Sequence, residues 1–264
     1  MSYHWNNSFE SGWATVWYKE WYEGRWRIGI MNLIAYVFAV SFPFLFRLVQ
    51  HSPQKLPSRV SLILHQYPAF AYSWFTETLP ELLLVYVLIL VVGAITREWQ
   101  SGTIEFLGQI PQTPGCIAGQ KGLWGMMELS FLAFSSSAIL WLVSRWTGHA
   151  LRVDAFILAV LLTTIGIVAF FWLMSWLAWL LHSTYTIIVI GIGLFIISLL
   201  MESVPLLHAF SLFTYITNQS AYQQGTVPWE HLGLCVAAAV GFGLITIRVA
   251  NRQEFIPTHG RDQR

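Results

Sequence analysis

Residues 96–122 form a polar segment whose residue types and order suggest a specific role. The segment reads TREWQSGTIEFLGQIPQTPGCIAGQKG and lies between two long apolar runs. Gly102 gives the backbone freedom to turn, and Thr103 can cap a short helix whose Glu105 would favour its positive end. Apolar residues such as Phe106 would give that helix a face for the groove of another protein. The pattern therefore predicts a protein contact, while an ordinary surface loop with capping residues is the alternative.

Catalytic and nucleotide-binding patterns are not found in this sequence. The run GCIAGQKG has the wrong spacing for a phosphate-binding loop, and no Ser or Thr follows its lysine. The eight histidines include no i,i+4 pair with a carboxylate, which gives no support to metalloprotease chemistry. Three serines at 135–137 lack the glycines of a nucleophile elbow. We therefore expect no catalytic residue, no metal site and no ATP hydrolysis by this chain alone.

The elements that must position the polar segment are membrane-spanning helices. The chain has 264 residues, of which 56% are hydrophobic and only 10% charged, compared with about a quarter charged in soluble domains. Its apolar runs approach the roughly 20 residues that cross a bilayer. We predict an all-α integral membrane protein with six transmembrane helices in a single domain, 1–264. The predicted spans are about 28–49, 81–96, 123–143, 156–181, 187–201 and 231–250.

The segments outside the spans divide into one amphipathic helix and two longer connections. Residues 1–27 are aromatic and charged, and Val16 and Trp17 would share one face of a helix with Phe9 and Trp13. Such a face suits an interfacial helix lying along the membrane surface. Residues 50–80 and 202–230 are predicted as connections between spans, because prolines interrupt them. The orientation given below makes both of them extracytoplasmic segments.

Basic residues predict the orientation of these spans. With both termini in the cytoplasm, nine Lys and Arg residues lie inside and five outside, which satisfies the positive-inside rule. The inner nine are Lys19, Arg25, Arg27, Arg97, Lys121, Arg248, Arg252, Arg261 and Arg264. This orientation makes 96–122 a cytoplasmic segment.

The polar segment resembles the coupling segment of exporter-type ABC transporter permeases, the type-2 ABC permease family. The ordered residues that carry the resemblance are REWQSGT, then E-F-L, a proline and a lysine. WYKEWYEGRWR, before the first span, also looks like the family's connecting helix. The resemblance implies that the following residues contact an ATPase subunit: Glu98, Gly102, Thr103, Glu105, Phe106, Leu107 and Pro111, with Lys121 at the end.

The same resemblance implies partners and a location. It implies an ABC ATPase subunit in two copies, which would bind ATP and Mg, and a second permease subunit, identical or related. The chain itself would bind no cofactor and no nucleic acid. It would lie in a bacterial cytoplasmic (inner) membrane among lipids, and an extracytoplasmic partner for 50–80 stays open. The expected function is a permease that forms the substrate path of an ATP-driven exporter.

Two other functions stay open on the sequence alone. An ion-coupled secondary transporter would use ionisable residues inside the membrane, and Glu128 is the only carboxylate well inside a predicted span. Glu128 could line a substrate path, or it could hydrogen-bond to a neighbouring span. An intramembrane enzyme is the second alternative. Turnover without any ATPase would favour either of them.

Overall fold

The computed structural model describes residues 8–50, 67–101, 112–149, 151–204 and 227–253, together with Ser211, Thr214 and Ile216. Within these ranges every regular element is helical, as the sequence predicts. Six helices in the described part are long and apolar enough to cross a membrane: Val16–Leu48, Phe70–Ser101, Pro114–Trp146, Val153–Leu181, Thr184–Met201 and Trp229–Arg252. Their number and order match the six predicted spans, and the chain has the architecture of a multi-pass membrane protein.

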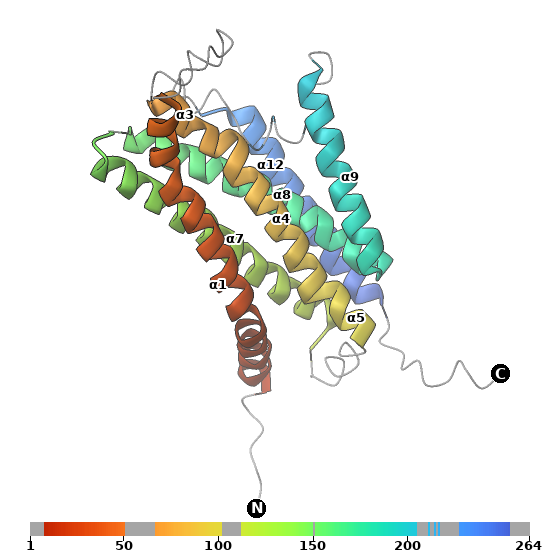
Figure 1. The fold of residues 1–264 in the computed structure, drawn as a ribbon. Coiled ribbons are helices and arrows are strands. Elements are labelled where there is room, and N and C mark those ends of the chain that lie inside the picture. The colour runs from red at the N-terminus through yellow and green to blue at the C-terminus, as the bar shows by residue number, and fades with distance from the viewer. Residues whose placement is uncertain are drawn as a thin grey trace, which may run out of the picture.

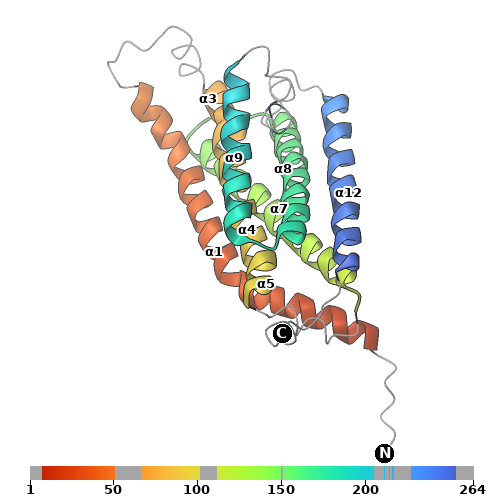
Figure 2. The same cartoon turned by 90° about the vertical axis from the view of Figure 1, so that its right-hand side faces the viewer.

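The first span and the helix before it form one continuous helix, α1 (Ser8–Gln50). Figure 2 shows its N-terminal part running across one end of the bundle, and the remainder rising along the side. Val16 and Trp17 face the bundle, since Val16 is buried and the Trp17 ring lies 5.4 Å from that of Trp124 on α7. The face expected to lie on the membrane surface therefore packs inward. A different aromatic set is exposed, namely Tyr18, Trp21, Tyr22 and Trp26.

The second span begins earlier than predicted. Residues 67–101 are helical throughout, as α3 (Tyr67–Ser73), the π-helical turn η1 (Trp74–Thr78), α4 (Leu79–Val91), a second π-helical turn η2 (Val92–Thr96) and α5 (Arg97–Ser101). Residues 67–80 of the segment predicted over 50–80 are thus helical and continuous with the second span. Pro68 is the second residue of α3, where a missing N–H breaks no helical bond. Pro80 follows a wide turn in which the Leu79 N–H bonds to the Trp74 carbonyl.

The return from the polar segment is also helical sooner than expected. The third span belongs to α7 (Pro114–Trp146), which begins with a proline at its first position. The Thr113 hydroxyl caps it by accepting from the Cys116 N–H at 3.3 Å. Residues 114–122 therefore extend the third helix beyond the predicted span, into the polar segment.

Three further helices complete the bundle. They are α8 (Val153–Leu181), α9 (Thr184–Ser203) and α12 (Trp229–Arg252). His182 ends α8 in the left-handed region, with φ of 54°, and so allows a two-residue connection to α9. Helix α8 is the most buried of the six spans and packs on α12, α4 and α7. Figure 1 shows that the beginning of α1 and the end of α12 lie at the same end of the bundle.

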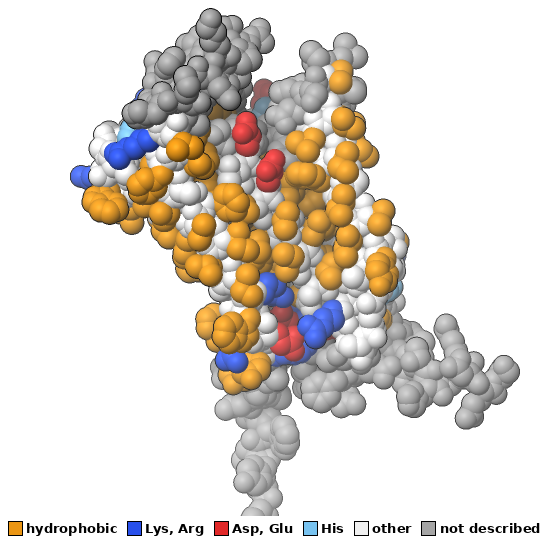
Figure 3. Space-filling view, in the orientation of Figure 1, with side chains coloured by type: hydrophobic (Ala, Val, Ile, Leu, Met, Phe, Trp, Pro, Cys, Tyr) orange, Lys and Arg blue, Asp and Glu red, His pale blue; other side chains and the backbone are white. Residues whose placement is uncertain are grey.

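The surface separates charged from apolar side chains along the bundle. Figure 3 shows hydrophobic side chains over the flank of the helices and charged side chains toward both ends, with acidic and basic side chains side by side at the end where α1 begins. Exposed large apolar residues include Leu33, Val37, Val189 and Val240. A helix that presents apolar side chains outward is typical of contact with lipid.

Candidate functional site

The structure brings together the two ends of the polar segment. Glu98 lies on α5, where the chain leaves the bundle, and Lys121 lies on α7, two turns after the chain returns. Lys121 Nζ donates to Glu98 Oε1 at 2.8 Å. The other predicted coupling residues, Gly102, Thr103, Glu105, Phe106, Leu107 and Pro111, lie outside the described residues.

Two charged residues of α1 complete a four-residue ion network. Lys19 pairs with Glu98, and Glu20 pairs with Lys121. Lys121 Nζ also donates to the Ala94 carbonyl at 3.0 Å, so the three donors of its ammonium group are all used. The network, Lys19, Glu20, Glu98 and Lys121, thus connects α1 to both helices that flank the polar segment.

The ion network is buried and electrically balanced. The side chains of Lys121, Glu20 and Glu98 are 2%, 5% and 6% exposed, whereas Lys19 is 22% exposed and reaches the surface. Two cations face two carboxylates, which avoids an uncompensated charge in a low-dielectric region. Removing one member of a buried ion pair leaves the other charge uncompensated, which costs about 3–5 kcal/mol, so the four side chains depend on one another.

A second charged cluster surrounds Glu128 on α7. Arg27 of α1 donates to both carboxylate oxygens, at 3.0 and 3.3 Å, and the Tyr86 hydroxyl of α4 donates at 2.6 Å. The Trp124 indole N–H donates to the same carboxylate from one turn earlier on α7. Glu128 is only 3% exposed and is therefore held by neighbouring helices, which is the second of the two roles considered for it. A role in a substrate path would require Arg27 to move away.

The two clusters repeat along α1 and α7 with their charges exchanged. Glu20 faces Lys121, and seven residues further along both helices Arg27 faces Glu128. The sequence separation is 101 residues in both pairs, which shows that α1 and α7 run side by side in the same direction. Seven residues correspond to about 10 Å of helix, or two turns.

Close helix contact at this place depends on small residues. A Cβ atom at Gly24 would lie 2.9 Å from Glu128 Oε1, and one at Gly93 would lie 3.1 Å from Arg27 Nη1. Both glycines therefore leave room for the Arg27 side chain to enter the bundle. A cavity of about 10 Å³, lined in part by Glu20, Arg27 and Lys121, lies between the two clusters.

Sequence reasoning found half of the ion network and missed the other half. The resemblance identifies Glu98 and Lys121 as part of the coupling segment. Lys19 enters the sequence analysis only through the count of basic residues and, with Glu20, through the resemblance of WYKEWYEGRWR. In the sequence, the charged residues of both helices are spaced by the same seven residues, Glu20 to Arg27 and Lys121 to Glu128. Using that spacing would have required the expectation that the first and third spans are neighbours.

The arrangement can hold helices in place. Within the described residues, no group of three or more His, Cys, Asp or Glu side chains could hold a metal ion. Most polar groups of the two clusters pair with one another, but Arg27 Nε and Glu98 Oε2 are buried without a hydrogen-bond partner in the described part of the chain. Neither the comparison with models of known protein families nor that with curated proteins found a match.

Proposed function

We propose that this chain is the permease subunit of an exporter-type ABC transporter of the type-2 permease class. The proposal rests on the polar segment 96–122, its resemblance to the coupling segment of that class, and the six candidate spans. One observation carries it furthest. The two helices that flank this segment are joined to each other, and to α1, by the buried ion network.

The ion network supplies a route for movement. A force applied to residues 102–111 reaches α5 and α7 along the chain, and Glu98 and Lys121 lie on these two helices. Because both residues are also paired with α1, three spans would respond together. Packed helices joined by buried ion pairs move as rigid elements and do not deform gradually. ATP-driven closure of a partner would thus change the arrangement of the spans and open the path on the other side.

The complex has a definite composition under this proposal. Two ATPase subunits bind ATP and Mg, and a second permease subunit, identical or related, encloses the path with this one. The polar segment and both termini lie in the cytoplasm, and the spans cross a bacterial inner membrane. The exposed aromatic residues Trp21, Tyr22 and Trp26 suit the membrane interface, where such rings are enriched.

Co-purification with a candidate ABC ATPase tests the proposal. The complex is reconstituted in lipid nanodiscs, after replacement of the native cysteines, with spin labels at Trp146 and Trp229. Both positions are exposed, at 84% and 74%, and they begin or end helices at the end of the bundle away from the ion network. Addition of ATP and Mg is expected to change the distance between the labels. Glu98→Ala is expected to keep ATP hydrolysis and lose this change.

Glu23→Ala is the matched control for this experiment. It removes one negative charge from α1, as Glu98→Ala removes one from α5. The Glu23 side chain is 53% exposed, and its carboxylate oxygen Oε1 lies 4.0 Å from Lys19 Nζ. The control should respond to ATP as the unaltered protein does. The proposal fails if no ATPase co-purifies and the chain transports alone, or if the two variants behave alike.

A further inference from the structure

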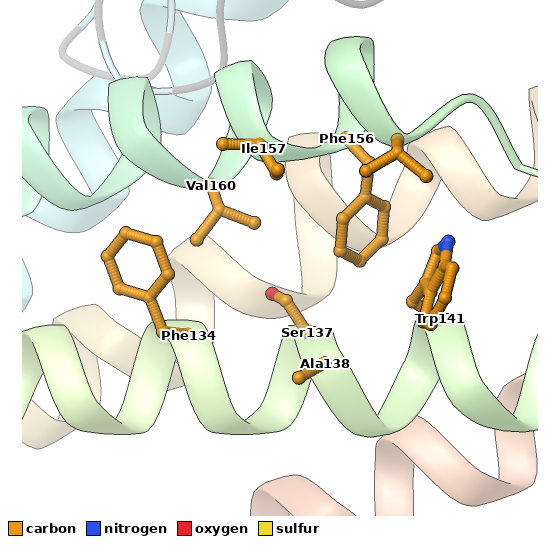
Figure 4. Close-up of a pocket in the computed structure, with 8 residues that line it drawn as sticks. Phe134, Ser137, Ala138, Trp141, Phe156, Ile157 and Val160 are labelled. Atoms are coloured by element: carbon orange, nitrogen blue, oxygen red, sulfur yellow. The ribbon is translucent and has the colours of Figure 1, made fainter.

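A groove between α7 and α8 lies away from both charged clusters. Figure 4 shows Phe134, Ser137, Ala138 and Trp141 of α7 facing Phe156, Ile157 and Val160 of α8 across it. Val153, the first residue of α8, completes the lining, and the groove encloses about 220 Å³. Ser137 is the only hydroxyl-bearing residue of the lining, so the wall is almost entirely hydrocarbon and aromatic.

The groove follows the helices through one half of the membrane-spanning region. Trp141 lies five residues before the end of α7 and Phe134 lies twelve before it, which corresponds to depths of about 8 and 18 Å. The hydrocarbon core is about 30 Å thick, so one leaflet extends over about 15 Å. Measured along the axis of α7, the groove therefore lies within a distance of the helix end that is comparable to the thickness of one leaflet.

Positive charge surrounds the mouth of the groove. The Arg145 guanidinium lies over the ring of Trp141, 5.5 Å from its centroid, and is exposed to the surroundings. None of the ion pairs formed by described residues includes Arg145. Arg152, next to Val153, pairs with Asp154 at 2.6 Å. Because this pair is neutral, Arg145 gives the region where α7 connects to α8 one more cation than carboxylates.

We infer that this groove is a binding site for an anionic phospholipid. One acyl chain lies in the groove between α7 and α8, and the phosphate of the headgroup accepts hydrogen bonds from Arg145. This site is additional to the proposed permease function and does not depend on it.

The size, depth and charge of the groove select this occupant. Pockets that enclose a whole small molecule have about 300–1,000 Å³, so a groove of this volume suits part of a chain. In a bilayer the surrounding solvent is itself hydrocarbon, and a chain fills the groove through packing contacts. Packing alone does not distinguish headgroups. An arginine at the mouth adds an attraction that is stronger for a headgroup of net negative charge, because the choline ammonium of phosphatidylcholine offsets the charge of its phosphate.

Native mass spectrometry of the purified protein tests this inference. The detergent-solubilised chain is titrated with phosphatidylglycerol and, separately, with phosphatidylcholine of the same acyl chains. The first bound phosphatidylglycerol is expected to be favoured about fivefold, as one arginine near a lipid phosphate provides. Arg145→Gln should remove this preference and leave phosphatidylcholine binding unchanged.

Filling the groove should weaken the first binding event for both lipids. Ala138→Trp fills it from α7, and Ile157→Trp fills it from α8 and serves if the first variant does not fold. Leu142→Trp is the control, because Leu142 is 56% exposed on the same helix but does not line the groove. Gel filtration and tryptophan fluorescence establish that each variant is folded.

Four results would overturn the inference. The first is equal binding of the two lipids to the unaltered chain, and the second is a preference that persists in Arg145→Gln. The third is that groove-filling variants bind lipid as the Leu142→Trp control does. If the groove variants instead change the oligomeric state, a second copy of the chain covers the groove and the lipid assignment is wrong.

Discussion

Removal of the Lys121 ammonium group is expected to destabilise the bundle more than any other single change in the ion network. Lys121→Met keeps the length of the side chain and removes its bonds to Glu20, to Glu98 and to the Ala94 carbonyl. Glu98 retains Lys19, but Glu20 loses the cation with which it pairs. Leaving such a buried carboxylate uncompensated costs about 3–5 kcal/mol.

The assay is thermal unfolding in detergent, followed by the fluorescence of the fourteen tryptophans. A loss of this size corresponds to an apparent Tm lower by about 6–20 °C for a chain of this length. Lys19→Met is the matched control. Because Lys19 is 22% exposed and its partner Glu98 keeps Lys121, the control should lose only about 1 kcal/mol.

A combined variant separates lost charge balance from lost packing. Lys121→Met together with Glu20→Gln and Glu98→Gln replaces the buried carboxylates by neutral amides, and should recover much of the stability that Lys121→Met loses. The reasoning is refuted if Lys121→Met and Lys19→Met lower the Tm equally. It is also refuted if neutralising the two carboxylates makes Lys121→Met worse.

Two further predictions concern packing and protonation. A Cβ atom at Gly122 would lie 1.9 Å from the Trp172 ring, so Gly122→Ala should lower the Tm. Gly233→Ala is the control and should leave the Tm unchanged, because a Cβ atom there would have nothing within 4 Å. Equal effects of the two substitutions would contradict the close contact of α7 with α8. Burial, and after it the charge of Arg47, lowers the pKa of His149 below its ordinary value. The contribution of His149 to the stability of the folded state is therefore present above the unfolded pKa of about 6.5 and is lost as pH falls. NMR titration of the ring should therefore give a low midpoint that rises in Arg47→Gln, and an unchanged midpoint would exclude the arginine as a cause.

The number of spans was predictable from the sequence because it depends on the length of apolar runs. The ends of the spans were less predictable, since they depend on how prolines are used. Pro68 was interpreted as a break, yet it lies in the first turn of α3, where it costs little. Pro114 begins α7 in the same way. A single sequence does not distinguish a proline that ends a helix from one that begins the next.

The candidate site was predictable only as far as local patterns extend. Glu98 and Lys121 lie at the two ends of one polar segment, and their proximity follows from a chain that leaves the bundle and returns. Glu20 and Lys121 are 101 residues apart, and no local rule pairs them. The π-helical turns before Pro80 and Arg97 leave no periodic signal in the sequence from which they could be predicted.

The exchanged charges along α1 and α7 fix the axial register of the two helices. If α1 slid forward along α7 by two turns, Glu20 would face Glu128, and if it slid back, Arg27 would face Lys121. Either slip places like charges together in a buried region, which costs several kcal/mol. A slip of two turns in either direction is thus disfavoured by two ion pairs of opposite polarity. Movements that keep both pairs carry α1 and α7 together, by tilting or rotating the two helices as a unit.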